Sequence, residues 1–224
     1  MTPDRPPDGT TPGPASTREL LLDAALVLFA ERGIDNVPLA EIVRTAGQRN
    51  ASAVHYHFGS RDEILRAALA RHVEAIADRR RELLARARAR PASDARSAAE
   101  AIVRPVTEFA QRGWRERAYL QIGSELTGAV DRVHPTLRQL MTRTEGHEAW
   151  KVLRQRCPEV PADLWRQRRE ICIVFVGRAA ADRARRLDRS ADPGDRHGIL
   201  SDDRFVDNLV DMVLGAMTAP HPGG

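Results

Sequence analysis

The residues whose types and spacing could recognise another molecule lie between positions 44 and 61. This segment holds three arginines, two histidines and no acidic residue, which suits a negatively charged partner. A helix that enters the major groove of DNA needs polar or small side chains outside and apolar side chains inside. The outer set is Arg49, Asn50, Ser52, His55, Tyr56 and His57, and the inner set is Ala53, Val54 and Phe58. This two-sided pattern predicts a DNA-recognition helix.

Two short helices are predicted ahead of this segment. Ser16 and Glu19 form a capping box that begins the first helix, and Gly33 ends it. The second helix is predicted from Pro38, a favourable first residue, to Ala46. These two helices would brace the recognition helix against the DNA backbone.

A long helix is predicted after the recognition segment. Asn50 can cap a third short helix that runs to His57, and Ser60 and Glu63 form a second capping box. Apolar residues then recur at helical spacing and fade before Pro91. Three short helices followed by a long one predict a helix-turn-helix domain over residues 16–60.

The rest of the chain is predicted to be helical as well. Ala, Leu, Arg and Glu dominate it, and no segment alternates with the period of a strand. We therefore predict an all-α fold with a second domain over 61–218. Residues 1–15 and 219–224 are rich in proline and glycine and are expected to be disordered tails. The further helices are predicted near 94–112, 114–128, 135–156, 162–187 and 202–218.

Three segments resemble the N-terminal domain of the TetR family of transcriptional regulators. Leu26–Gly33 is similar to the first-helix signature, Glu41–Gly47 to the second helix and turn, and Val54–Arg61 to the recognition helix and the start of helix four. They occur in the family's order and spacing. The resemblance implies a three-helix DNA-binding domain on a larger helical domain, which binds a ligand and dimerises through its last two helices.

The resemblance also implies roles for single residues. Tyr56 and His57 fall where family members touch phosphates and bases, and Arg61 takes the place of a phosphate-binding lysine. Thr17 and Arg18 would be further phosphate contacts. The recognition-helix face would carry Ser52, Ala53 and His55, while Arg49 and Asn50 could read guanine and adenine.

The chain departs from the family pattern in three places. The turn over 48–51 is one residue longer than usual, and His55 replaces a frequent tyrosine. Val37 and Pro38 replace the usual hydroxyl residues at the start of the second helix, so a phosphate contact is expected to be missing there. Asn36 is a candidate to cap that helix instead.

Candidate ligand-pocket residues of the second domain are Trp114, Tyr119, Glu125 and Trp150. Ligand pockets are mostly apolar with a few polar anchors, which these residue types could provide. The alternative is that the two tryptophans belong to the core.

Two late segments are candidates for a dimer interface. The stretch 171–177 is apolar on nearly every side, and such a helix must be buried. Packing on its own domain and on a second copy would satisfy this, whereas a monomeric core helix is the alternative. The expected interface residues are Val174, Phe175, Leu209, Val213 and Met217.

Composition narrows the remaining function classes. The net charge is +4, and Lys151 is the only lysine, so the arginine excess reflects a chain-wide bias. The arginines at 79–81 are interpreted as a solvated helix face. Neither a signal peptide nor an apolar span of about 20 residues is evident, and the two cysteines lack zinc-site spacing. We expect a cytoplasmic bacterial protein, associated with the nucleoid when bound to DNA, without metal or cofactor.

The predicted function is a dimeric repressor that a small molecule releases from a palindromic operator. A DNA-binding regulator without a ligand and an activator remain alternatives. No nucleophile–base arrangement, carboxylate pair or glycine-rich phosphate loop supports an enzyme.

Overall fold

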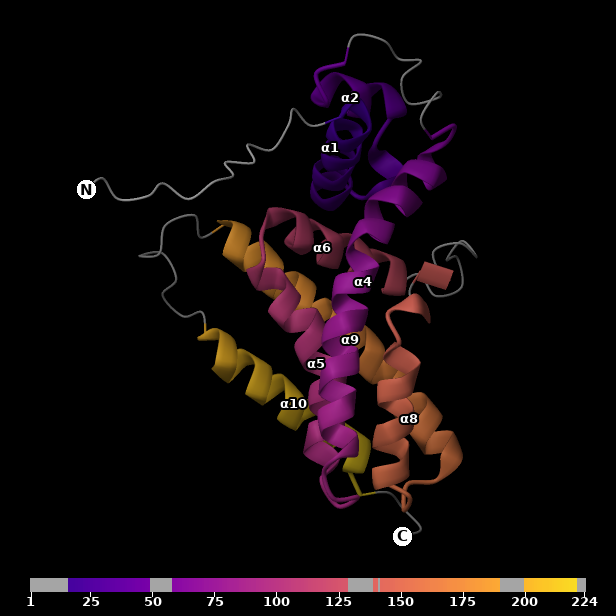
Figure 1. Cartoon of the computed structure of the whole chain (residues 1–224), viewed down its shortest axis with the longest axis vertical. Coiled ribbons are helices and arrows are strands. Elements are labelled where there is room, and N and C mark those ends of the chain that lie inside the picture. Colours follow the sequence, from indigo (N-terminus) through magenta and orange to yellow (C-terminus); the bar gives the residue numbers. More distant parts are fainter. Residues whose placement is uncertain (1–15, 49–57, 129–138, 141, 190–199, 221–224) are drawn as a thin grey trace, which may run out of the picture.

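A computed structural model describes residues 16–48, 58–128, 139–140, 142–189 and 200–220. All regular structure in these residues is helical, which confirms the predicted fold class. An N-terminal group of helices lies at one end of an elongated helical body (Figure 1). No helix in the described residues is both long and apolar enough to cross a membrane.

The N-terminal helices begin and end where the local sequence predicts. Helix α1 (Thr17–Arg32) starts at Ser16, whose hydroxyl accepts a hydrogen bond from the Glu19 backbone N–H at 3.3 Å. Gly33 ends it with φ +84°, a left-handed value that favours glycine. A 3₁₀ turn, η1 (Ile34–Asn36), and helix α2 (Leu39–Thr45) follow. The predicted third helix lies in 49–57, outside the described residues.

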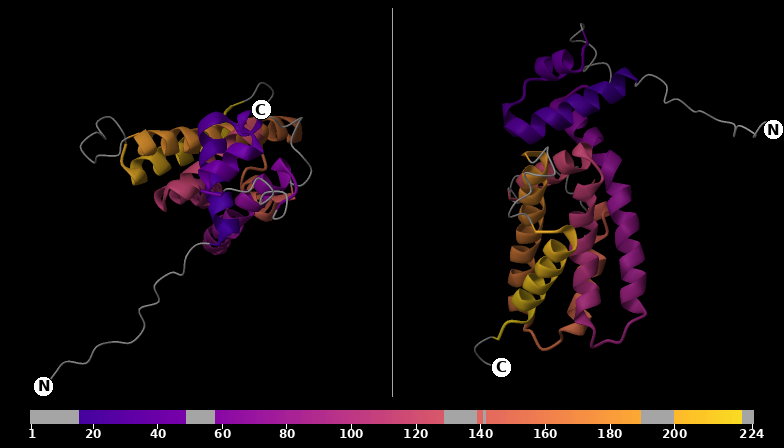
Figure 2. Two further views of the ribbon diagram at one scale, coloured as in Figure 1. Left: turned by 90° about the horizontal axis from the view of Figure 1, so that it is seen from above. Right: turned by 90° about the vertical axis from the view of Figure 1, so that its left-hand side faces the viewer.

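Helix α4 (Arg61–Arg88) is the long helix that the second capping box predicts. Ser60 accepts a hydrogen bond from the Glu63 N–H at 3.2 Å. The helix runs from the N-terminal group down one edge of the body, and α9 and α10 lie side by side on the opposite edge (Figure 2). The body consists of α5 (Ala95–Thr107), η2 (Glu108–Gln111), α6 (Trp114–Gly128), α8 (Gly146–Arg156), α9 (Ala162–Arg189) and α10 (Asp202–Thr218).

Two predicted helices are interrupted. The helix predicted over 94–112 changes to 3₁₀ geometry after Thr107, shortly beyond Pro105. The helix predicted over 135–156 is wrong in its extent, because a turn separates α8 from the described helical residues before it. Glu145 has φ +57° there, a left-handed conformation that an α-helix cannot contain.

Helix α6 contributes to more than one core. Its residues Ala118 and Ile122 pack with the apolar face of α1 and with the first turns of α4. Its residue Leu120 packs with Ile76 and Phe109 in a separate cluster lower in the body. In Figure 1, α6 lies between α1 above it and α5 and α9 below it. A third, larger cluster holds α5, α8, α9 and α10 together.

Candidate DNA-binding and ligand-binding sites

The N-terminal domain positions three of the predicted DNA-contacting residues within the described part. Thr17 is half-buried and Arg18 exposed in the first turn of α1. The Arg18 guanidinium lies over the Phe58 ring, 5.2 Å from its centroid. Arg61 is half-buried, and its Nη1 donates to the Asp35 backbone oxygen at 3.3 Å. The other predicted contacts, Arg49, Asn50, Ser52, Ala53, His55, Tyr56 and His57, lie outside the described residues.

Val37 and Pro38 stand at the start of α2 in place of the hydroxyl residues that are usual in the family, and each has a structural role there. Val37 is fully buried in the core of the N-terminal helices, and Pro38 is the N-cap residue without a side-chain hydrogen bond. The prediction that Asn36 caps α2 is wrong. Its Nδ2 donates instead to the Arg32 carbonyl oxygen at 2.8 Å. Asn36 therefore satisfies the end of α1. Glu41 links α1 and α2 by accepting from Arg32 Nη1 at 2.7 Å.

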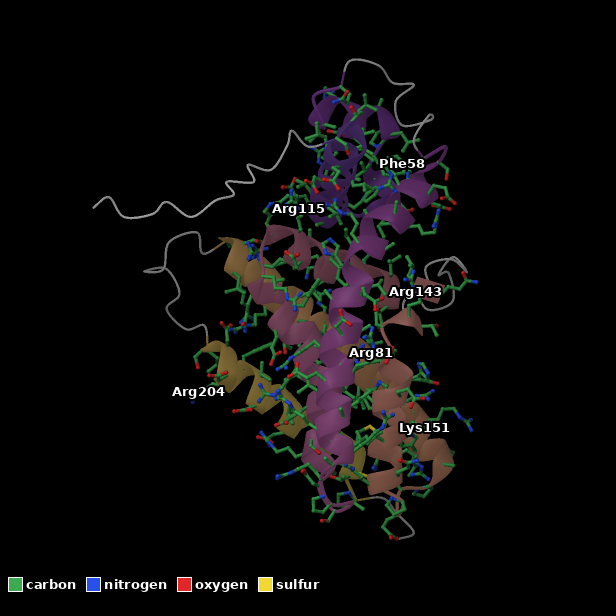
Figure 3. All side chains as sticks on the ribbon, viewed as in Figure 1. Phe58, Arg81, Arg115, Arg143, Lys151 and Arg204 are labelled. Atoms are coloured by element: carbon green, nitrogen blue, oxygen red, sulfur yellow. The ribbon has the colours of Figure 1, made fainter. Side chains whose placement is uncertain are left out.

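Helix α6 contacts α1 at two separated points. Near the N-terminus of α6, Arg115 donates two hydrogen bonds to Asp23, from Nε at 2.9 Å and from Nη2 at 2.5 Å. Asp23 accepts a third hydrogen bond from Arg71 of α4, at 3.0 Å. Arg115 lies at the junction between the two parts of the molecule in Figure 3. Its hydrogen bond lowers the pKa of the Asp23 carboxyl below the ordinary value, although partial burial opposes this. The paired charges fix α6 against α1.

The second contact lies beyond the C-terminal end of α1. The Ile34 backbone N–H donates to Glu125 Oε1 at 3.2 Å. A Cβ atom on Gly33 would lie 3.3 Å from the same oxygen, so the small residue permits this close approach as well as the left-handed turn. A side chain of α6 thus satisfies a backbone donor of the N-terminal domain.

A cavity of about 610 Å³ lies on the other side of α6. Its volume is within the range of small-molecule pockets. Helices α4, α5, α6, α8 and α9 all contribute to its wall. Its apolar lining is Ile76, Ile102, Val106, Leu120, Trp150, Ile173 and Val176, and its polar lining is Arg80, Tyr119, Ser124, Thr127, Thr142, Thr144, His147 and Arg169.

Arg80 is a buried cation in this wall. Only 4% of its surface is exposed, and it donates to the backbone oxygens of Ala101, at 3.2 Å from Nε, and of Thr144. The Ala101 oxygen is free to accept because Pro105, four residues later, has no N–H to donate. Burial lowers the pKa of Arg80 to about 10, which leaves it protonated at neutral pH. The interpretation of residues 79–81 as a wholly solvated face is therefore wrong at Arg80.

The cavity includes two of the four predicted pocket residues. Tyr119 and Trp150 line it. Trp114 lies elsewhere, 39% exposed at the start of α6, and Glu125 points toward the N-terminal domain instead. Sequence reasoning missed Arg80 and Arg169. The apolar spacing of α4 could have placed Arg80 on its inner face, four residues after Ile76, but the arginine run concealed it.

His72 lies between the cavity and the α1–α6 junction. Its ring centroid is 5.4 Å from that of Tyr119, a cavity residue, and 5.8 Å from that of Phe109. Its Nδ1 lies 3.8 Å from Glu116, the neighbour of Arg115 in sequence. Burial lowers the pKa of His72, which favours the neutral ring. Packed side chains therefore connect the cavity wall to the junction.

The predicted dimer residues fall into two groups. Val174 is 41% exposed, and Phe175 is half-buried on α9. Leu209, Val213 and Met217 are buried in the chain's own core, because this face of α10 packs against α5. These three cannot contact a second copy without rearrangement. The exposed apolar residues of the two helices include Ile171 and Met212, at 61% and 48%.

The N-terminal helices are similar in sequence to a known protein family. Residues 21–68 match the family profile described as bacterial regulatory proteins, tetR family. The chain is 34% identical over 103 residues to the HTH-type transcriptional repressor KstR2 of Rhodococcus jostii, covering 46% of this chain and 47% of that protein. It is 41% identical over 54 residues to the HTH-type transcriptional regulator SrpR of Pseudomonas putida, covering 24% of this chain and 25% of that protein. The matches thus span less than half the length of these relatives.

Solved structures extend the likeness in fold to nearly the whole chain. AmtR of Mycobacterium smegmatis superposes with a TM-score of 0.58 at 19% identity, covering 96% of this chain and 91% of that one. The fatty acid degradation regulator FadR of Bacillus halodurans gives a TM-score of 0.52 at 12% identity, covering 88% and 97%. At these identities the likeness shows the fold. The sequence match to the tetR family of bacterial regulatory proteins is thus confined to residues 21–68, and beyond them the likeness to these proteins is one of fold.

Proposed function

We propose that the protein is a dimeric transcriptional repressor that leaves its DNA operator when a small molecule enters the cavity. The observation that carries the proposal is the double role of α6. One face of this helix holds α1 through Arg115 and Glu125, and the other forms part of the cavity wall through Tyr119 and Leu120. A ligand that moved α6 would therefore move the helix that positions the DNA-binding domain.

The coupling requires that the ligand bind one arrangement of α6 more tightly than another. Inside the cavity, a ligand beside Tyr119 would also act on His72 and on the Glu116–Arg115 turn of α6. The continuous helix α4 joins the same two parts, so it would transmit a movement of the body to the N-terminal helices. Movement of α1 at Asp23 would then alter the spacing of two recognition segments in a dimer.

Dimerisation is proposed through the outer faces of α9 and α10. Ile171 and Val174 are exposed apolar residues three positions apart on α9, so they share a face, and Met212 is exposed on the neighbouring α10. A two-fold dimer through this surface would match a palindromic operator. We expect light scattering to give the dimer mass, and Val174→Glu to shift the protein toward the monomer. An Asp163→Asn control at the exposed start of α9 should leave the mass unchanged.

Selection of genomic DNA fragments by the purified protein tests the DNA-binding part. A palindromic sequence should be enriched, and binding should weaken steeply as salt rises because arginine contacts to phosphates release counterions. Fragments enriched no better than bulk DNA would contradict the proposal.

A ligand screen tests the inducible part. Compounds that raise the melting temperature of the protein should also release it from the selected DNA. Compounds that bind in the cavity yet leave DNA affinity unchanged would favour the ligand-independent regulator. A promoter reporter in a heterologous host distinguishes repression from activation.

A further inference from the structure

The charge of the cavity is unusual for an apolar pocket. Arg80 and Arg169 both line it, together with His147. None of the described lining residues is an aspartate or a glutamate. The carboxylate nearest in sequence to the Arg80 partner Thr144 is Glu145, and it accepts from Arg81 on the outer surface at 3.0 Å. The described wall therefore carries two arginines and no acidic residue, and Glu145, whose charge favours the protonated form of Arg80, is itself paired with Arg81 outside the cavity.

Arg169 is the less satisfied of the two arginines. Its Nε atom is buried and has no hydrogen-bond partner. No carboxylate of the described residues forms an ion pair with its guanidinium. A buried donor without an acceptor costs about 1–3 kcal/mol, more when it is charged, and the guanidinium that carries this donor belongs to a residue of the cavity wall, so an anionic group bound beside it would be favoured.

The other arginine contributes charge rather than free donors. Arg80 directs Nε and Nη1 to two backbone oxygens, which orient it but do not neutralise it. A buried cation is costly unless an anion is close. An anionic group in the cavity would therefore be favoured by both guanidinium groups, and a cationic ligand would be repelled by both.

The other side chains of the wall indicate the chemistry of the rest of the ligand, beyond its anionic group. Trp150, Ile102 and Val176 provide an apolar surface on different helices. Burial raises the pKa of Tyr119 to about 12, so its hydroxyl remains a donor. A cavity of this volume accepts a drug-sized molecule with most of its surface buried.

Resting on the function proposed above, we infer that the cavity binds an organic acid, with a carboxylate held by Arg169 in the field of Arg80 and an apolar body against Trp150. A carboxylate is planar and its two oxygens only accept hydrogen bonds, so it matches the planar array of N–H donors of a guanidinium group.

The test uses the full-length protein without DNA and measures melting temperature and tryptophan fluorescence. The probes are decanoate, naphthoate and biphenylcarboxylate, each with its primary amide and its primary amine of the same skeleton. We expect at least one acid to bind about tenfold or more tightly than its amide, and the amines to bind more weakly still.

Arg169→Gln should weaken binding of that acid by about tenfold or more and leave binding of the amide unchanged. Arg166→Gln is the matched control, since Arg166 is exposed on the same helix. A general loss of structure would weaken acid and amide together. Equal binding of acid and amide, tighter binding of an amine, or full acid affinity in Arg169→Gln would overturn the inference, as would failure of all the acids to bind.

The result separates this inference from the function on which it rests. If acids bind with the expected pattern but never affect DNA binding, the inducible mechanism fails and the ligand class stands. If only neutral or cationic compounds release the protein from DNA, the ligand class fails and the regulator stands.

Discussion

The Asp23–Arg115 pair at the α1–α6 junction gives the most direct test of how the two parts are joined. Asp23→Asn keeps the shape of the side chain and removes its charge. The side chain of Asp23 is 20% exposed, and those of its partners Arg71 and Arg115 are 27% and 43% exposed. Fully exposed pairs contribute about 0.2–1 kcal/mol, and hydrogen bonds to charged groups about 1.5–3 kcal/mol.

This partly buried pair should lie between those limits. Solvation of the exposed part of Arg115 weakens its attraction to Asp23 and lowers the expected cost. The substitution also removes the charged acceptor that Arg71 and Arg115 share, which raises the cost. We expect Asp23→Asn to lower the free energy of unfolding by about 1–2 kcal/mol. Arg115→Gln should cost about 1 kcal/mol, and the double variant should cost less than the sum, because the shared interaction can be lost only once. Asp35→Asn, at an exposed position of the same domain, is the control.

The pH dependence gives a second signature of the same pair. The folded-state pKa of Asp23 lies below its ordinary value of 3.8, so the ionised carboxylate stabilises the fold. That stabilisation is complete above the unfolded pKa and is lost as the pH falls through the folded pKa. The difference in unfolding free energy between wild type and Asp23→Asn should therefore stay constant from about pH 7 to 5 and shrink below about pH 4.

Chemical denaturation followed by circular dichroism measures both quantities. Strict additivity of the two single substitutions would refute the idea that Asp23 and Arg115 stabilise the junction together. A cost for Asp23→Asn no larger than for Asp35→Asn would refute it too.

Four further outcomes are expected. Gly123→Ala should raise the free energy of unfolding by about 0.5–1 kcal/mol, because the added methyl meets no atom within 4 Å and glycine disfavours a helix interior. Arg156→Gln should lower it by about 2 kcal/mol, since this side chain donates to three acceptors around the α4–α5 turn. Cys157 and Cys172 should react with a thiol reagent only on unfolding, because both are buried and burial raises the pKa of each thiol. Arg61→Gln should weaken binding to the selected DNA and reduce its salt slope by about 1, as measured by fluorescence anisotropy.

Local signals in the sequence predicted the helix boundaries well. The capping boxes at Ser16 and Ser60 place the starts of α1 and α4 at the next residue, and Gly33 ends α1. These signals depend on neighbours within one turn, so they can be seen without tertiary structure. The break at Glu145 could not be predicted, because glutamate rarely adopts a left-handed conformation and nothing in the neighbouring sequence indicates one there.

The candidate sites were harder to predict because they depend on which helices meet. Periodicity shows that α10 has an apolar face, but not that α5 covers it, so it could not reveal that Leu209 and Val213, predicted at a dimer interface, lie in the chain's own core. Glu125 was predicted to line the ligand pocket, but its carboxylate instead accepts from a backbone donor 91 positions away. Arg80 is buried through contacts with α5 and with the turn before α8.

The shared use of α6 also limits how far this protein can be treated as a set of exchangeable modules. Ala118, Ile122 and Leu140 complete the core of the N-terminal helices, although they follow the long helix in sequence. A chimaera cut after residue 60, the end of the predicted helix-turn-helix segment, would leave α1 without its apolar neighbours on α4 and α6 and Asp23 without Arg115. Transplanting the proposed DNA-binding part onto another protein of this fold would therefore require grafting the α1-facing side of α6 with it, and successful exchanges should be confined to recipients that already present such a surface.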